Sequence, residues 1–410
     1  MKKKINQIFL NNFFSLSLNQ IINILYTIII TPILFKRIEV GNFGLVTLYF
    51  SIIMILAVIV GYGYNINAPK RIASFKKIND LQNLVNEVIT TRLYFAFIIL
   101  ILSFTSLFFI TDFSSLCIFY FSLIIVLSEA INPFFYFQGT DQLLGAALSN
   151  FFVKLLYLIL IISFVNSKND AYLVNLFFGL SSLIIYLITW VYIYIKNNLK
   201  WHFSTPKIVL KRLKENVYFT LSSLSGYLSI NSALIVLSVF VNDSELGKFS
   251  IAHKIGLFLR MLPVFITQSI LQEASRKLKN DRFNYNNFIS NTYLYSLIFT
   301  LFLGIVISVF SKWIIYLFSG EYIIYSQIIL SILSFVPFFS MLNFKNMISI
   351  ILNERKKILN ITSWYTVLLT FILGIIMSYY FGGLGMAISL IFSEIFNYIL
   401  CNYFLKNDKK

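Results

Sequence analysis

The sequence predicts an all-α polytopic membrane protein with twelve transmembrane helices in two six-helix bundles. The prediction rests on composition, on the spacing of the apolar runs and on the distribution of basic residues. Of the 410 residues, 58% are hydrophobic and 12% are charged, and the mean hydropathy is +0.81. A soluble domain carries about 25% charged residues. Only lipid solvates such an apolar surface.

The apolar runs have the length of membrane-spanning helices. A hydrocarbon core of about 30 Å needs roughly 20 apolar residues per helix. In lipid, every backbone N–H and C=O must be satisfied within the segment, which favours helices over strands. The runs predict helices over residues 12–35, 43–63, 93–111, 115–137, 146–166, 171–195, 217–241, 247–272, 292–317, 322–344, 360–381 and 384–405.

The basic residues predict the orientation. If the N-terminus is cytoplasmic, the predicted cytoplasmic segments hold 24 of the 33 Lys and Arg residues, and the opposite helix ends hold 5. Because Lys and Arg near helix ends stay in the cytoplasm, both termini are predicted to be cytoplasmic. The net charge of +17 is then explained by the orientation of the helices in the membrane. No nucleic-acid partner is expected, because nucleic-acid binding needs a basic patch on a folded domain.

The chain is predicted to divide near its middle. The longest cytoplasmic segment, residues 196–216, separates an N-terminal six-helix lobe, residues 1–200, from a C-terminal lobe, residues 201–410. A short repeat supports two related halves, because Val40-Gly41-Asn42-Phe43 recurs as Leu246-Gly247-Lys248-Phe249. Duplicated halves are typical of transporters.

Enzymatic activity is not expected. The predicted outer loops are short, whereas membrane polymerases and lipid-sugar-dependent glycosyltransferases usually carry large ones. The sequence has no P-loop motif. Its two Cys and two distant His residues cannot build a metal site, so no cofactor is expected.

Polar stripes mark two of the predicted helices. In the first, every fourth residue from Ser15 to Thr31 is polar, including Asn19 and Asn23, and this spacing keeps them on one half of the helix. The seventh carries a series of serines beside Asn231. Such stripes either mediate close helix packing or line a water-filled cavity, and both interpretations stay open.

Three basic residues lie deep within predicted spans, away from the helix ends. Arg260 is about 20 Å from either end of its helix, too far for its side chain to reach the interface. It must pair with an acid or face water. His253 lies one heptad before Arg260 on the same face, and Lys254 lies about 100° around the helix from His253, so this helix is expected to present a broad cationic sector. Lys154 is about 12 Å from the predicted cytoplasmic edge, so it either snorkels or faces a cavity.

Two acids lie within the spans as well. Glu394 is near the middle of the twelfth predicted helix, and Glu129 is in the inner half of the fourth. A carboxylate in the membrane either neutralises a buried base or couples transport to a proton or sodium gradient.

Several short motifs indicate a family. Pro32, expected to close the first helix, precedes Val40-Gly41-Asn42-Phe43-Gly44, similar to L-G-x-x-[YF]-G. The run from Pro133 through Gln138 and Gly139 to Asp141 is similar to P-x-W-x-F-Q-G-x-E, and Gly247 opens a segment similar to G-x-Y-x-x-A-x-K-I. On these motifs the chain resembles the Wzx-type lipid-linked oligosaccharide flippases of the polysaccharide transporter family, in the multidrug/oligosaccharidyl-lipid/polysaccharide (MOP) exporter superfamily.

The resemblance implies two bundles in a V that alternate between inward-open and outward-open states. It implies undecaprenyl pyrophosphate bearing an oligosaccharide as the substrate, membrane lipids and polysaccharide polymerase or chain-length machinery as partners, and a bacterial cytoplasmic membrane location. Arg260, Lys254 and Lys154 would bind the pyrophosphate. Asn231, Asn19 and Asn23 would hydrogen-bond water and sugar hydroxyls. Glu394 or Glu129 would couple transport to an ion gradient.

Two alternatives are weighed against a flippase. A multidrug or cation antiporter of the same superfamily needs an acidic, aromatic cavity, whereas the predicted interior is cationic. A non-transporting membrane subunit of a glycan-export assembly has no use for a basic residue as deep as Arg260.

Overall fold

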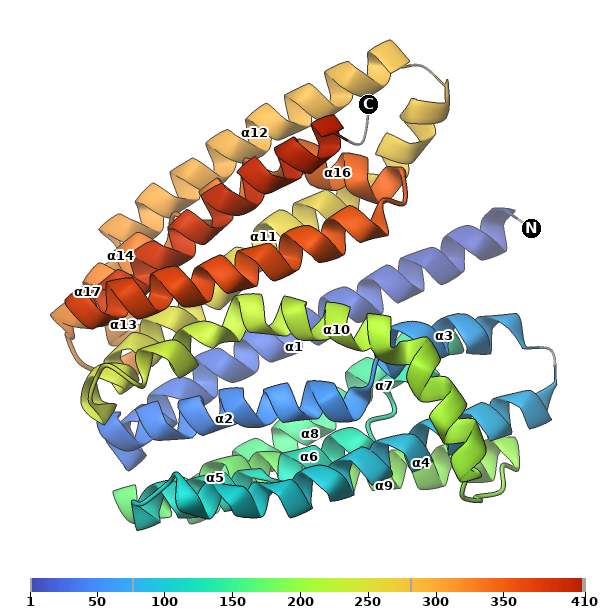
Figure 1. The fold of residues 1–410 in the computed structure, drawn as a ribbon, viewed down its shortest axis with the longest axis horizontal. Coiled ribbons are helices and arrows are strands. Elements are labelled where there is room, and N and C mark those ends of the chain that lie inside the picture. The colour runs from blue at the N-terminus through green and yellow to red at the C-terminus, as the bar shows by residue number, and fades with distance from the viewer. Residues whose placement is uncertain (1, 76, 281, 408–410) are drawn as a thin grey trace. The chain divides into compact units, whose positions relative to one another are not determined.

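A computed structural model describes residues 2–75, 77–280 and 282–407 of the protein (Figure 1). Its regular secondary structure, within these described residues, is helical throughout. The chain forms two compact units, residues 1–224 and residues 225–410, which we call unit 1 and unit 2. The boundary falls inside helix α10, Pro206–Leu237. The sequence-based boundary between residues 200 and 201 precedes this helix.

Unit 1 consists of the segments that come before α10 and the first part of α10 itself. These are α1 Lys2–Ile38, α2 Val40–Gly61, α3 Tyr64–Ser74, α4 Ile78–Leu102, η1 Ser103–Phe108, α5 Phe113–Ser122, α6 Ile124–Ala130, α7 Phe134–Gly139, α8 Leu143–Phe164, η2 Lys168–Asp170 and α9 Ala171–Asn197.

Unit 2 consists of the rest of α10 and the helices that follow it. These are α11 Asp243–Asn280, α12 Arg282–Val309, α13 Ser311–Ser319, α14 Ile324–Leu333, α15 Val336–Met341, α16 Phe344–Leu352 and α17 Lys356–Asn407.

The helices are long and apolar enough to cross a membrane. In the described residues there are ten such spans, or eleven if α10, which bends by 61° between Pro206–Ser229 and Asn231–Leu237, is one span. One of the ten, Lys357–Asn407, has 51 residues and is interrupted at Gly382. Its two arms fold back on each other (Figure 1), so we count it as two spans, and together with α10 as one span this makes the structure consistent with the predicted twelve.

The break in α17 requires glycine and is held by side chains of unit 2. Gly382 has φ 56° and ψ −136°, a conformation that L-residues with a side chain avoid. The next N–H, of Gly383, donates to the carboxylate of Glu245 at 3.2 Å and to the Tyr325 hydroxyl at 2.8 Å. The Tyr325 hydroxyl in turn donates to Glu245. Backbone groups freed by the break are therefore satisfied locally.

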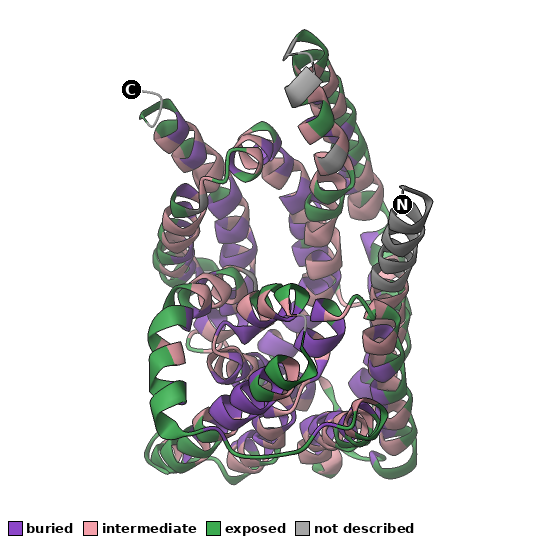
Figure 2. Ribbon diagram, turned by 90° about the vertical axis from the view of Figure 1, so that its right-hand side faces the viewer, coloured by how far each residue is buried: buried purple, intermediate pink, exposed green. Residues whose placement is uncertain are grey.

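Helix α1 has two unlike faces. Ile21, Leu25 and Ile29 are 52%, 54% and 48% exposed, and they recur every fourth residue along its outer side. Ile30 and Leu34 are buried on the opposite side. Figure 2 shows exposed and buried faces alternating around the helices. An apolar exposed stripe is what a lipid-facing helix requires.

Pro32 does not close α1, and that expectation is wrong. The helix continues to Ile38, six residues further. Proline lacks the N–H that would bond the carbonyl four residues earlier. Membrane helices tolerate this loss because neighbouring helices and local adjustments re-satisfy the freed group.

The motif that begins at Pro133 packs against α3 in unit 1. Helix α3 carries Tyr64, Ala68 and Ile72, which share a buried cluster with Phe135 and other aromatic residues of α7. A Cβ atom added to Gly139 would lie 2.6 Å from the Cβ of Ile72, so α7 approaches α3 at a distance that only glycine permits.

The other motif residues occupy different places. Gln138 is exposed, and Pro133 is buried at the start of α7. Gly41 and Gly44 lie in the first turns of α2, and Gly247 is buried near the start of α11. Their equivalent positions after the first helix of each half agree with the predicted repeat.

The start of α10 is fixed to unit 1 by a buried carboxylate. Glu87 of α4, with a side chain 6% exposed, accepts hydrogen bonds from Arg71 at 2.7 Å, Arg212 at 3.3 Å and the Tyr64 hydroxyl at 3.2 Å. Arg212 belongs to α10. A buried carboxylate surrounded by two guanidinium groups and a hydroxyl is well satisfied. The cytoplasmic segment predicted to separate the halves thus begins a helix that packs on unit 1.

Candidate functional site

The deepest predicted cation, Arg260 of α11, forms an ion pair within unit 2. Its guanidinium lies 2.6 Å from the carboxylate of Glu394 in α17, and it also donates to the backbone carbonyl of Ser229 at 2.7 Å. The Glu394 side chain is 5% exposed and the Arg260 side chain 19% exposed. The sequence predicts that Arg260 either pairs with an acid or faces water, and that Glu394 either neutralises a base or couples transport to an ion gradient. The structure shows an ion pair between them, in which part of the guanidinium stays accessible.

The carbonyl bonded by Arg260 is next to the bend of α10. Two other carbonyls of the same turn also accept side-chain hydrogen bonds: Ser229 Oγ donates to Gly226 O at 2.9 Å, and Asn231 Nδ2 donates to Tyr227 O at 3.4 Å. Polar groups that compete for helix carbonyls are a recognised cause of helix bending. Asn231 therefore uses one amide hydrogen within its own helix.

The neighbours of Arg260 on α11 have different environments. Lys254 is partly buried. His253 is 2% exposed and its ring stacks on Phe249, with 5.5 Å between centroids. His253 therefore belongs to the packed interior of unit 2, and it does not extend the accessible cationic surface of this helix.

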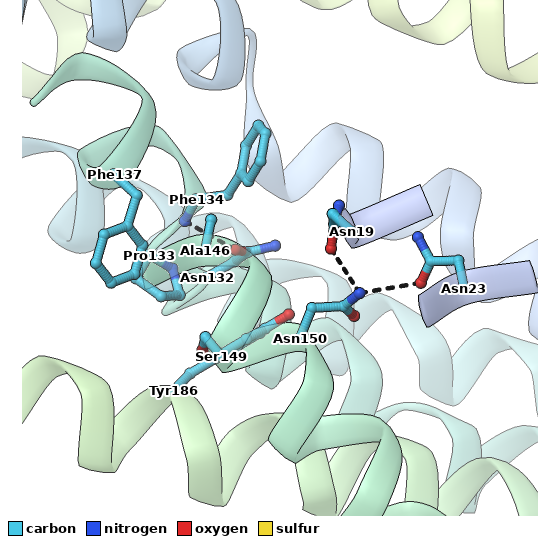
Figure 3. A pocket seen from close by; sticks show the side chains of 10 residues that line it. All are labelled: Asn19, Asn23, Asn132, Pro133, Phe134, Phe137, Ala146, Ser149, Asn150 and Tyr186. Carbon is cyan, nitrogen blue, oxygen red and sulfur yellow. Dashed lines mark hydrogen bonds between the residues drawn. The ribbon is translucent and has the colours of Figure 1, made fainter. Parts of the chain in front are cut away.

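Unit 1 contains a pocket of about 140 Å³. Asn19 and Asn23 of α1 lie on one of its sides, where Asn150 Nδ2 of α8 donates to their Oδ1 atoms at 2.7 Å and 3.0 Å (Figure 3). The other lining residues are Asn132, Pro133, Phe134, Phe137, Ala146, Ser149 and Tyr186. The pocket therefore brings the predicted stripe of α1 together with the motif that begins at Pro133.

Lys154 lies on α8 one turn beyond Asn150. Its Nζ is 4.6 Å from the ring centroids of both Tyr26, in α1, and Phe178, in α9. Within the part of the chain that the structure describes, no carboxylate forms a salt bridge with it. Two aromatic faces stabilise an ammonium electrostatically without cancelling its charge. The side chain is thus directed between helices of unit 1.

Glu129 belongs to a second polar cluster of unit 1. Its carboxylate accepts from Asn132 Nδ2 at 2.9 Å. Arg92 donates to the Asn132 carbonyl at 3.1 Å and to Asn65 Oδ1 at 2.8 Å, and its guanidinium lies 5.1 Å from the Phe135 centroid. Glu129 and Arg92 interact electrostatically. The cluster gives Glu129 a basic neighbour, and its role in ion coupling stays a prediction.

Sequence reasoning missed several of these residues. The sequence places Arg92 among the basic residues of a predicted cytoplasmic segment, yet the residue is 0% exposed within unit 1. Asn150 was not singled out. Its position four residues before Lys154, on the same helix face, is the signal that could have found it. In the described residues no group of three His, Cys, Asp or Glu side chains could hold a metal ion.

Long apolar helices in two units, with charged and amide side chains inside them, define a polytopic membrane protein of the transporter type. The chain belongs to the family described as "Polysaccharide biosynthesis protein", whose family model matches residues 9–271. It is 24% identical over 386 residues to a Shigella dysenteriae protein named "Putative O-antigen transporter", covering 91% of this chain and 94% of that protein.

Solved structures identify the fold as that of the MOP superfamily. An inward-facing multidrug resistance MATE family transporter matches with a TM-score of 0.71 at 14% identity, over 96% of this chain and 97% of that one. The lipid II flippase MurJ, in an inward closed conformation, matches with a TM-score of 0.66 at 17% identity, over 97% of this chain and 87% of that one.

Proposed function

We propose that the protein is a flippase that moves an oligosaccharide linked to undecaprenyl pyrophosphate from the inner to the outer leaflet of the bacterial cytoplasmic membrane. The proposal combines the family, the relative named as an O-antigen transporter and the fold shared with MurJ. Alternating access of the two units would carry the head group across. Contacts with a polymerase or with chain-length machinery stay a prediction.

The observation that carries the proposal is Lys154, an ammonium held inside the helices of unit 1 by two aromatic rings. A basic residue within a membrane span is costly and is kept where it serves a substrate pathway. The pyrophosphate of the proposed substrate is a multiply charged anion, whose unassisted transfer through hydrocarbon is prohibitive. Cations inside the protein compensate that charge.

Arg260 adds a second, switchable cation. While it pairs with Glu394 its charge is neutralised. A phosphate that competes for the guanidinium, or a proton that neutralises the carboxylate, would release Arg260 to the substrate. In this exchange Glu394 would couple transport to an ion gradient. The released Arg260 would then act together with Lys254, a second cation six residues earlier on α11.

The antiporter alternative fits the interior less well. A carrier for organic cations needs acids that attract its substrate, whereas the accessible part of the Arg260–Glu394 pair is the guanidinium. The pocket of unit 1 has no charged lining residue. The accessible guanidinium favours an anionic group, and the uncharged amide-lined pocket favours a polyhydroxylated one, whereas neither feature attracts an organic cation.

Deleting the gene in its own bacterium tests the proposal. We expect the surface polysaccharide to disappear and its lipid-linked precursor to accumulate, because the precursor stays in the inner leaflet. Immunoblotting of the surface glycan and mass spectrometry of the extracted lipids measure both effects. The wild-type gene should restore the glycan. An unchanged glycan together with altered drug sensitivity would favour the antiporter instead.

A further inference from the structure

The pocket of unit 1 has the size of a single small polar molecule. Its volume of about 140 Å³ corresponds to four or five water molecules. Pockets for drug-sized ligands measure about 300–1,000 Å³. A whole oligosaccharide or a prenyl chain therefore does not fit, whereas one sugar ring does.

The amide groups of the pocket are only partly used within the protein. Asn150 Nδ2 donates both of its hydrogens, to Asn19 and Asn23. Among the described residues, the Nδ2 atoms of Asn19 and Asn23 and the Oδ1 atom of Asn150 form no further hydrogen bond. Each NH₂ group offers two donors, and the carbonyl oxygen offers an acceptor. The cluster thus presents both kinds of partner, as a hydroxyl group requires.

The opposite wall is apolar and aromatic. Pro133 and Phe137 lie across the pocket from the α1 asparagines, and Phe134 lies beside them (Figure 3). Asn132, although it lines the pocket, is committed to the protein, because it bonds Glu129 and accepts from the Phe134 N–H at 3.0 Å. A pocket with amides on one side and rings on the other suits a ring whose faces carry C–H groups and whose rim carries hydroxyls.

We infer that this pocket binds one uncharged sugar ring of the transported head group, with its hydroxyls on Asn19, Asn23 and Asn150 and its C–H face against Phe137. The inference rests on the proposed function, since it assigns a place to part of that substrate. Asn150 and Lys154 are separated by one helical turn, about 6 Å along α8. A head group can therefore contact the amides with a sugar and the ammonium with a phosphate.

Ligand binding to the purified full-length protein in detergent tests the inference. The two probes are undecaprenyl pyrophosphate bearing one N-acetylhexosamine and undecaprenyl pyrophosphate without sugar. We expect the wild type to bind the sugar-bearing probe at least tenfold more tightly. Asn150→Leu removes the amide and Ala146→Phe fills the pocket, so each should abolish this preference while affinity for the sugar-free probe stays within about twofold.

A variant on the outer face of the same helix provides the control. Leu148 is 47% exposed, so Leu148→Phe adds a ring without entering the pocket and should keep the preference. Thermal unfolding establishes that each variant is folded, and Ala146→Phe keeps the three asparagines intact if Asn150→Leu is unstable. Equal affinity of the wild type for both probes would overturn the inference. So would a preference that survives in folded Ala146→Phe.

The same experiment separates this inference from the proposed function. Binding of both probes with equal affinity would refute the sugar pocket but would not contradict the flippase proposal. Failure to bind either probe removes the substrate itself, and with it both proposals.

Discussion

Replacing Arg260 by alanine is expected to abolish transport and to destabilise unit 2. The variant leaves the carboxylate of Glu394, 5% exposed, without its partner at 2.6 Å, and frees the Ser229 carbonyl near the bend of α10. Breaking a buried pair by removing one partner costs about 3–5 kcal/mol. We expect a clear fall in Tm of the purified protein and loss of surface polysaccharide in complementation.

A double variant separates the two effects. Arg260→Met combined with Glu394→Gln removes both charges, and replacing a buried pair by residues of similar volume is often neutral for stability. The double variant should recover the wild-type Tm but remain inactive. Arg276→Ala, on an exposed part of the same helix, is the matched control and should change neither quantity. Full transport by the double variant would show that the pair is only structural.

Replacing Lys154 by methionine is expected to inactivate the protein without destabilising it. The two cation–π contacts contribute about 0.5–2 kcal/mol. Placing a lysine at the centre of a membrane helix costs about 2.5–3.5 kcal/mol in insertion experiments. The free-energy cost of the buried charge exceeds the stabilisation from the two cation–π contacts. Lys154→Met should therefore leave the Tm unchanged or raise it, while transport falls at least tenfold.

The sign of the stability change is the informative part of this test. Replacing a residue that is kept for packing lowers the stability of the protein. Replacing a residue that is kept for function at the expense of stability raises it. Lys154→Arg should retain part of the activity because it keeps the charge. Lys168→Met, at an exposed pair with Glu39, is the control. A lower Tm with full transport in Lys154→Met would contradict the assigned role.

Much of the fold follows from hydropathy because the bilayer constrains each helix independently of its neighbours. The outward stripe of Ile21, Leu25 and Ile29 and the inward positions of Asn19 and Asn23 follow from the period of the helix alone. The end of one predicted helix at residue 381 agrees with the break at Gly382, since consecutive glycines interrupt the apolar run.

Other features depend on which helices are neighbours, and a single sequence does not contain that information. The pairing of Arg260 with Glu394 joins residues 134 positions apart, and the bond from Asn150 to Asn19 spans 131. The basic start of α10 falls in the cytoplasmic segment predicted over residues 196–216, where hydropathy predicts no helix. Hydropathy predicts which segments contact lipid, but it does not reveal that Arg212 of this segment pairs with the buried Glu87 of α4.

The most direct test is transbilayer movement in liposomes that contain only the purified protein and a fluorescent undecaprenyl pyrophosphate-linked oligosaccharide. A membrane-impermeant quencher measures how much of the probe reaches the other leaflet. We predict rapid movement with the wild type and with Arg276→Ala, and movement at the protein-free rate with Lys154→Met. Wild-type protein that is folded, inserted and no faster than empty liposomes would contradict the account.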